Sequence, residues 1–228
     1  SAAPYQGLPR EDFARVVAFV ATLRGMELKP LRRRRRATVC RWATCCCRAR
    51  SARLCAFHGF KAVFIGSSSP NQEIVGLPDQ AVVSVSEIIA YNGVIAANLD
   101  IPVLADVDDF GTTPLNIYRF AKQADRAGIG CAAFDDRMPI NRATAYSVPG
   151  VFPKARMIDN IHAAADARED MVLIARCLAP TPNGSYTEML DRAAAYAEAG
   201  ADAIWIGLRS ADDYVKAAAI VKTPLMAV

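Results

Sequence analysis

Residues 101–136 read IPVLADVDDFGTTPLNIYRFAKQADRAGIGCAAFDD and predict one strand–helix–strand unit. The stretch begins and ends with short apolar runs that lead into aspartates, a pattern typical of strands buried on both faces. Between these runs, residues 113–128 carry apolar side chains at helical spacing, with Pro114 near the first turn and Gly128 at the end. Because a helix that joins two parallel strands is the repeating unit of a parallel sheet, this stretch predicts an α/β fold.

The same alternation continues on both sides of this unit. It predicts strands at 37–43, 61–67, 171–176, 201–207 and 223–228, and helices at 84–99, 154–170, 185–200 and 210–221. The expected architecture is a TIM-type (β/α)8 barrel in which seven strands are found and the last βα unit is lacking. We expect one barrel domain over 1–228, in which 1–30 forms an N-terminal helix and 31–50 is a divergent Arg/Cys-rich segment.

Local signals mark several helix ends. Ser84 or Ser86 is the candidate N-cap of the helix at 84–99. Ser185 and Glu188 have capping-box spacing at the start of 185–200, and Gly200 is expected to close that helix.

Composition and charge limit the classes of function. The chain has 228 residues, of which 53% are hydrophobic, but no apolar run has the roughly 18 residues that a membrane helix needs. Nine of the 27 Lys and Arg residues lie in 32–53, so the rest of the chain carries 18 basic residues against 23 acids. A mildly acidic body argues against a nucleic-acid partner, and the lack of a long apolar run argues against a membrane partner. The seven cysteines suggest no disulfide framework, and no signal peptide is evident, so we expect a cytoplasmic protein.

Carboxylates gather where the predicted strands end. Asp106 and Asp108 end one strand, and Asp135 and Asp136 end the next. Because the carboxyl ends of parallel strands share one edge of the sheet, these acids are candidate Mg²⁺ ligands. Alternatively, they cap helices or form ion pairs with nearby arginines, of which Arg119, Arg137 and Arg142 are the candidates.

Two further features lie at the same edge. Arg176 ends the strand at 171–176, where it is placed to bind a substrate carboxylate or to form a structural salt bridge, for example with Asp135. The segment GSSSPN at 66–71 offers hydroxyls and amides that could hold an anion, or it is an ordinary loop. Neither His58 nor His162 has a nucleophile partner in the pattern, which argues against a hydrolytic triad.

Seven segments follow one another in the order SARLCAFHGFKAVFIGSSS, VGLPDQ, IPVLADVDDFGTTPLNIYR, AGIGCAAFDD, FPKARMIDNIHAAADARED, MVLIAR and YAEAGADAIWI. On these segments, residues 48–228 resemble the isocitrate lyase / phosphoenolpyruvate mutase family. It implies a Mg²⁺-dependent lyase or phosphonomutase-like enzyme, which makes or breaks a C–C or P–C bond in a small 2-oxo or hydroxy acid through a metal-stabilised enolate. It also implies a homo-oligomer, either a dimer or a tetramer.

The resemblance assigns roles by position. Asp106 and Asp108 match the metal-site aspartates, and Asp135 stands where a metal-site glutamate is usual. Arg176 matches the arginine that binds the substrate carboxylate. Ser67 and Ser68, together with Asp106, belong to the substrate-binding set.

The chain also departs from the family pattern. The loop in which the lyases carry a catalytic cysteine reads RMPINRATAYSVPG at 137–150, without Cys or His. This favours the mutase-like branch, with Arg137, Asn141 and Arg142 as candidate catalytic residues. The acids expected after the fifth and sixth strands are replaced by Leu178 and Gly207. The alternative is therefore a catalytically silent or decayed barrel with an interaction role.

The run from Arg32 to Phe57 combines nine arginines with five cysteines and no acid. Adjacent Cys45–Cys47 suit a zinc site poorly, because neighbouring side chains point apart. A basic arm at Arg32–Arg36 that binds phosphate is a second reading. The third is a stretch translated out of frame, because the family's Pro-Gly-x-Tyr-Asp falls on Thr44–Arg48 and family-like sequence resumes at Ser51. Resequencing the gene decides this third reading.

Overall fold

The computed structural model describes residues 42–43, 48–79, 81–111, 113–137, 150–178, 185–208 and 210–227. The expected helix at 1–30, nearly all of 31–47, and the loop residues Asn141 and Arg142 lie outside these ranges. The assignment of 1–228 to one barrel domain therefore stays a prediction.

The described strands form one parallel sheet of seven strands in the order of the sequence. They are β1 (Trp42–Ala43), β2 (Ala62–Ile65), β3 (Val103–Asp106), β4 (Cys131–Asp135), β5 (Val172–Cys177), β6 (Ala203–Ile206) and β7 (Leu225–Ala227). Each falls within or beside a range that the sequence predicts, and β1 occupies the end of the expected 37–43 strand. The α/β class and the count of seven strands are confirmed.

The sheet is curled. Phe64 lies on β2 and Trp205 on β6, yet their ring centroids are 5.3 Å apart. Neighbouring strands are about 4.8 Å apart, so in a flat sheet β2 and β6 would be separated by roughly 19 Å. The inner face therefore wraps around a lumen, and the observed fold is a partial barrel.

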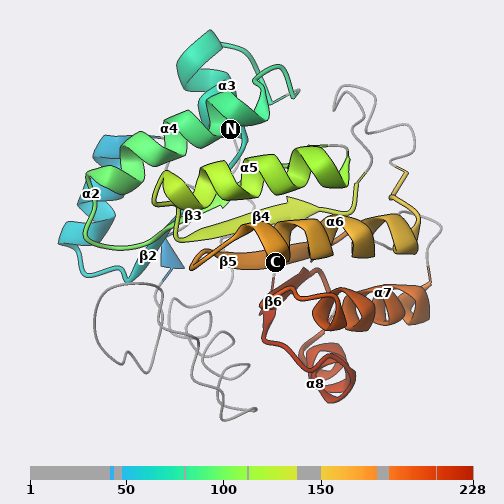
Figure 1. Cartoon of the computed structure of the whole chain (residues 1–228). Coiled ribbons are helices and arrows are strands. Elements are labelled where there is room, and N and C mark those ends of the chain that lie inside the picture. The colour runs from blue at the N-terminus through green and yellow to red at the C-terminus, as the bar shows by residue number, and fades with distance from the viewer. Residues whose placement is uncertain are drawn as a thin grey trace.

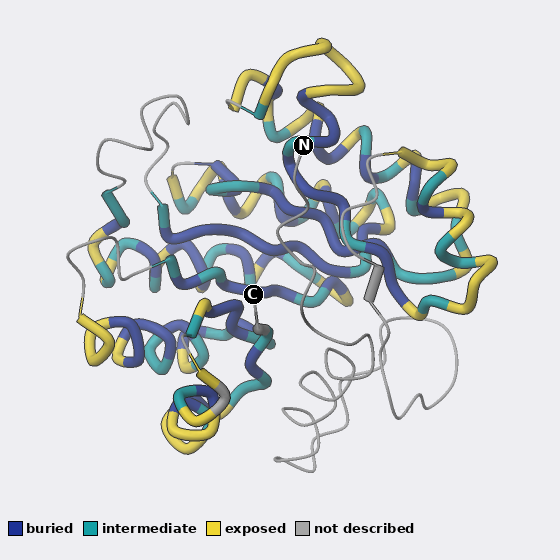
Figure 2. The backbone as a smooth tube through the Cα atoms, turned by 180° about the vertical axis from the view of Figure 1, so that it is seen from behind, coloured by how far each residue is buried: buried dark blue, intermediate teal, exposed yellow. Residues whose placement is uncertain are grey.

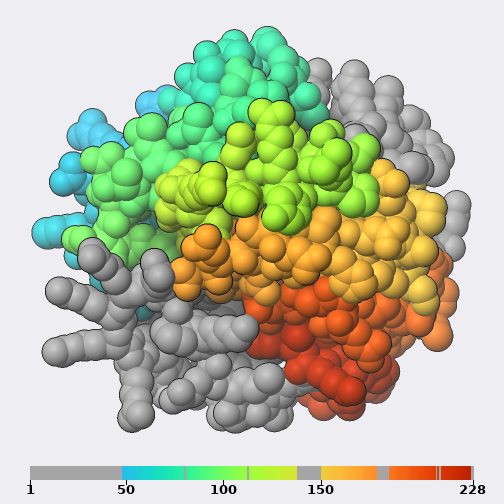
Figure 3. Space-filling model, viewed as in Figure 1, coloured from blue at the N-terminus to red at the C-terminus, as the bar shows by residue number. Residues whose placement is uncertain are grey.

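Helices cover the outer face of this sheet (Figure 1). They are α2 (Ala49–Phe57), α3 (Ser68–Val75), α4 (Val85–Ala97), α5 (Pro114–Arg126), α6 (Lys154–Ala167), α7 (Tyr186–Glu198) and α8 (Ala211–Ile220). In the space-filling view α5 and α6 lie against each other and hide the strands behind them (Figure 3). None of the described helices is long and apolar enough to cross a bilayer.

Helix starts follow the side chains that cap them, with one correction. Ser84 caps α4 in a complete capping box with Glu87, and Thr113 caps α5 just before Pro114. At α7, however, Ser185 accepts a hydrogen bond from the Thr187 amide, while Glu188 pairs with Arg192 at 3.0 Å. The predicted box between Ser185 and Glu188 is therefore wrong, because Arg192 one turn later attracts the Glu188 carboxylate.

A second correction concerns 66–71. The reading of this segment as an ordinary loop is wrong, because α3 begins at Ser68 and includes Pro70 and Asn71. Proline is tolerated in the first turn of a helix, where its missing N–H has no intrahelical partner. The helix ends at Gly76, which has a positive φ of 67°.

Strand alternation divides the core into two parts. Outward side chains such as Phe134 and Leu173 pack under the helices, and inward ones such as Leu104, Ala133 and Ile174 fill the lumen. Strands β2 to β6 are accordingly buried almost throughout their length (Figure 2). Cys131 and Cys177 are buried, as expected of cysteines that act as small hydrophobic residues.

Candidate active site at the carboxyl ends of the strands

Side chains along a strand point alternately to the two faces of the sheet, so the consecutive aspartates at the end of β4 lie on opposite faces. Asp135 lies on the inner face with Ala133, and Asp136 lies on the outer side, under the helices. The inner position brings Asp135 beside Arg176 of β5, its register partner, and both face Asp106 of β3. We call Asp106, Asp135 and Arg176 the inner cluster.

The guanidinium of Arg176 joins the two carboxylates of the inner cluster. Its Nη1 lies 3.0 Å from Asp106 Oδ2, to which it donates a hydrogen bond, and 3.0 Å from Asp135 Oδ1. The expected alternative, a salt bridge between Arg176 and Asp135, is thus present. None of the described helices is capped by these acids, so the helix-cap alternative is wrong.

Asp108 lies on a strained turn above this cluster. Asp108 and Phe110 both have positive φ, 51° and 56°, in a region that non-glycine residues rarely occupy. The turn is held by the Asp108 amide, which donates to Asp106 Oδ1 at 3.3 Å, and by the Asp108 carbonyl, which accepts from the Asp135 amide at 2.6 Å. The fold therefore tolerates backbone strain to place this carboxylate near the other two.

Burial and mutual repulsion shift the pKa values of these acids upward. Burial raises the pKa of Asp108 to about 8, with further contributions from the charges of Asp106 and Asp135. Burial also raises the pKa of Asp135 to about 7, against the opposing effect of Arg176. Burial alone would lower the pKa of Arg176, but Asp135, Asp106 and Asp108 outweigh it and raise that pKa. Asp108 and Asp135 therefore keep their protons to a higher pH than exposed aspartates do.

Ser67, the residue that precedes α3, reaches Asp108, and two more serines follow it in the first turn of the helix. Ser67 is buried, and its hydroxyl makes a hydrogen bond that lowers the pKa of Asp108. Ser68 is half-buried at the first position of the helix. Ser69, the third serine of the GSSSPN segment, is fully buried, and its hydroxyl has no hydrogen-bond partner within the described ranges.

Of the three candidate catalytic loop residues, only Arg137 is described. Its charge lowers the pKa of Asp135, and its backbone forms an isolated bridge with Val151. Asn141 and Arg142 lie outside the described residues, so their roles stay predictions. Arg119, an alternative partner for the acids, instead lies over the Phe120 ring at 5.7 Å.

An aromatic residue completes the inner cluster. The Arg176 guanidinium carbon lies 4.3 Å from the centroid of the Trp205 ring, and Trp205 is the register partner of Arg176 on β6. No sequence pattern pointed to Trp205 as a site residue. The alternation of inward and outward positions along ADAIWIG could have done so, because it places Trp205 on the same face as Ile174 and Arg176.

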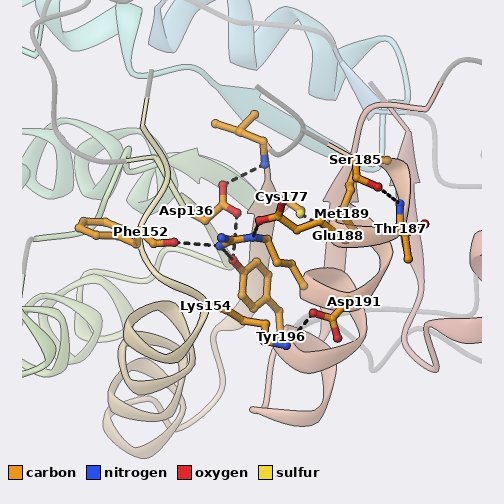
Figure 4. A network of polar contacts seen from close by, with 12 residues as sticks. Asp136, Phe152, Lys154, Cys177, Ser185, Thr187, Glu188, Met189, Asp191 and Tyr196 are labelled. Atoms are coloured by element: carbon orange, nitrogen blue, oxygen red, sulfur yellow. Dashed lines mark hydrogen bonds and ion pairs between the residues drawn. The ribbon is translucent and has the colours of Figure 1, made fainter. Parts of the chain in front are cut away.

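A second polar network lies on the other side of the sheet, around Asp136 (Figure 4). Asp136 Oδ1 accepts from the Leu178 amide at 2.9 Å, and Oδ2 accepts from the Tyr196 hydroxyl at 2.9 Å. Arg192 Nη1 donates to Tyr196 Oη at 3.2 Å and to the Phe152 carbonyl at 2.8 Å. We call these five residues the outer network. No sequence pattern predicted it, because its members come from separate parts of the chain.

The donor set of the site suits Mg²⁺ in part. Asp106, Asp108 and Asp135 offer only oxygen atoms, and Asp135 Oδ1 is buried without a hydrogen bond from any described residue, although Arg176 lies close by. Within the described ranges, no three acid, His or Cys side chains converge as a complete metal-binding group. Mg²⁺ needs only one or two direct carboxylates because it keeps several waters, so the residues present fit this ion.

These features define a class of protein: a parallel α/β partial barrel with carboxylates and an arginine at the carboxyl ends of its strands. Residues 47–228 match the family model described as phosphoenolpyruvate phosphomutase. The 2-methylisocitrate lyase of Shewanella oneidensis is 31% identical over 172 residues, which are 74% of this chain and 59% of that protein. The 2,3-dimethylmalate lyase of Eubacterium barkeri is 28% identical over 170 residues, 74% of this chain and 58% of that protein.

Solved structures agree. Oxaloacetate acetylhydrolase with 3,3-difluorooxaloacetate superposes with a TM-score of 0.71 at 28% identity, covering 79% of this chain and 63% of that one. Phosphonopyruvate hydrolase in complex with oxalate and Mg²⁺ gives a TM-score of 0.70 at 26% identity, covering 94% and 72%. The chain belongs to the phosphoenolpyruvate mutase / isocitrate lyase superfamily. It spans about three-fifths of the length of the curated relatives it matches.

Proposed function

We propose that the chain is a Mg²⁺-dependent lyase or phosphonomutase-like enzyme that makes or breaks a C–C or P–C bond in a small 2-oxo or hydroxy acid. The observation that carries the proposal is the inner cluster, in which a partly buried arginine and two buried aspartates from three successive strands meet at the lumen. Relatives named as lyases, decarboxylases and a phosphonopyruvate hydrolase support a small oxo-acid as the substrate.

In this proposal the aspartates hold the metal. Asp106 and Asp108 are the direct ligands, and Asp135 completes the shell, directly or through water. Bound there, Mg²⁺ supplies stabilisation of the negative charge that develops on the substrate's oxo group. The strained turn at Asp108 supports this role, because unfavourable backbone geometry is retained where a side chain must be placed exactly for function.

The remaining residues bind the substrate and move protons. Arg176 is proposed to bind the substrate carboxylate, for which its buried Nε, which has no hydrogen-bond partner among the described residues, is available. Ser67 and Ser68 hold the same end of the substrate through hydroxyls and amides at the start of α3. Arg137, Asn141 and Arg142 are the candidates for proton transfer or charge stabilisation over the reacting atoms.

Two wider features belong to the same proposal. The curled sheet supplies seven strands of a (β/α)8 barrel, as the superfamily comparison suggests. The protein is proposed to work in the cytoplasm as a homo-oligomer, a dimer or tetramer, as the family resemblance implies.

The alternative is a catalytically silent barrel. Two observations favour it: Leu178 stands where a family acid is expected, with its amide engaged by Asp136, and Gly207 follows β6 where another acid is expected. In this reading the inner cluster is a structural ion pair that survives from an active ancestor.

Calorimetry of oxalate binding separates the two. We expect oxalate to bind the full chain in the presence of Mg²⁺ and not after chelation. We expect Asp106→Ala to weaken binding at least 100-fold, because it removes a metal ligand and a partner of Arg176. Asp166→Ala is the matched control, because Asp166 is an exposed acid on α6 and should leave binding unchanged.

Folding of each variant is checked by circular dichroism, and Asp106→Asn serves if the alanine variant is unstable. Absence of Mg²⁺-dependent binding of both oxalate and pyruvate to the wild-type chain would remove the enzyme proposal and leave the silent barrel.

A further inference from the structure

Trp205 occupies a central position in the lumen. It lies in the middle of β6, with Arg176 of β5 and Met226 of β7 as its register partners. Only 9% of its surface is exposed, so the indole is part of the inner core and not a surface ring. No role in the proposed chemistry accounts for such a large aromatic residue here.

Two ring contacts hold the indole in place. The Phe64 ring meets it edge-on, with an interplanar angle of 78°. The Arg176 guanidinium lies over it, with Cζ 4.3 Å from the ring centroid. The indole Nε1–H is buried and meets no acceptor among the described residues, so packing and not a hydrogen bond fixes its orientation.

Arg176 in turn depends on this ring. Carboxylates hold the guanidinium through a single nitrogen, Nη1, while Nε makes no hydrogen bond to any described residue. An arginine fixed through one nitrogen can still rotate about its long side chain. The indole face blocks that rotation, and it attracts the cation strongly because both groups are largely out of water.

We propose that Trp205 is a positioning residue for Arg176, and that the stacked indole sets the affinity of the site for small carboxylates. The inference rests on the proposed function, in which Arg176 binds the substrate carboxylate. It adds a requirement for an aromatic ring at position 205, because only a ring face offers the cation both a flat support and a region of negative charge.

The test compares Trp205→Phe with Trp205→Leu in the full chain, using oxalate binding in the presence of Mg²⁺. We expect the leucine variant to bind oxalate about tenfold more weakly and the phenylalanine variant to stay within about threefold of wild type. Ile174→Val is the matched control. It trims a non-aromatic side chain of the same lumen cluster, on the strand that carries Arg176, and should lower stability slightly but leave oxalate affinity within about threefold.

Fluorescence supplies a readout that loss of packing alone would not produce. With Trp42→Phe as background, Trp205 is the remaining tryptophan of the two in the chain. Oxalate that binds to Arg176 should then change the fluorescence emission of Trp205. In the Arg176→Met variant of the same background, oxalate should leave this emission unchanged.

The outcomes are distinct. If the wild type binds no oxalate, the proposed function and this inference both fall. If the wild type binds oxalate, three results each overturn the inference alone: unchanged affinity in Trp205→Leu, equal loss in Trp205→Phe, or a tenfold loss in Ile174→Val.

Discussion

Asp135 and Asp136 are neighbours in sequence and both are buried, yet the groups they belong to differ in how well their polar atoms are satisfied. In the outer network both carboxylate oxygens of Asp136 accept a hydrogen bond, from Leu178 and Tyr196. In the inner cluster Asp135 Oδ1 and Arg176 Nε are buried without a hydrogen bond from any described residue.

This difference separates stability from function. A buried network in which every atom has a partner contributes to one rigid arrangement, whereas unsatisfied buried groups cost free energy unless a ligand satisfies them. The outer network ties the ends of β4 and β5 to α7, and the inner cluster is the part left open for a substrate and a cation. Three substitutions test this contrast, in order of their expected effect on stability.

Asp136→Ala should have the largest effect. It leaves the Leu178 amide and the Tyr196 hydroxyl without their acceptor in the core, and it opens a small cavity. We expect the free energy of unfolding to fall by about 3 kcal/mol. Urea denaturation measures the change, with the exposed Asp166→Ala as the control. A loss below about 1 kcal/mol would mean that the network is not a source of stability.

Tyr196→Phe should have a smaller effect. It keeps the ring, which is fully buried, and removes only the hydroxyl that donates to Asp136 and accepts from Arg192. We expect a loss of about 1–1.5 kcal/mol in the same denaturation assay. Oxalate affinity of the folded protein should stay within about threefold, since β4 and β5 remain paired. A tenfold loss of affinity would instead link the outer network directly to ligand binding.

Asp135→Asn should change stability least. Burial, reinforced by Asp106 and opposed by Arg176, raises the pKa of Asp135 from 3.8 to about 7. A carboxyl group whose pKa is raised on folding makes the folded protein less stable as pH rises from the pKa of the unfolded state through the pKa of the folded state. At pH 8 the charge of Asp135 is therefore a cost to the folded state. Without Mg²⁺ at that pH, we expect the free energy of unfolding of the asparagine variant to lie within about 1 kcal/mol of the wild-type value.

The same variant should lose oxalate binding in the presence of Mg²⁺, which is the reverse of the pattern expected for Tyr196→Phe, where stability falls and binding stays. A loss of stability above about 2 kcal/mol, with binding intact, would make Asp135 a structural residue.

Much of the fold follows from the sequence because its signals are local. The apolar runs, Ser84, Thr113 and the glycines at 128 and 200 each act within a few residues of where they stand. The two errors have a common cause. At α7 the side chain of Arg192 competes for Glu188, and at 66–71 the proline that suggested a loop lies in the first turn of a helix. In both places a contact or position one turn away decided the structure.

The site was less predictable. Strand ends identify Asp106, Asp108, Asp135 and Arg176 as one group, because parallel strands share an edge. Residue type alone does not show that Asp136 points away from this group or that Trp205 points toward it. Those two facts depend on the phase of alternation in each strand and on which strands the curl brings face to face.

The contact between Phe64 and Trp205 also has a consequence for how the chain folds. Within a strand–helix–strand unit, most contacts join residues that are close in sequence, so such a unit can form early. The aromatic pair instead joins the second strand to the sixth. Contacts between residues far apart in the chain carry a large loop-closure cost and are expected late on the folding pathway. We therefore expect the lumen, and with it the ligand site, to be completed after the individual strand–helix–strand units have formed.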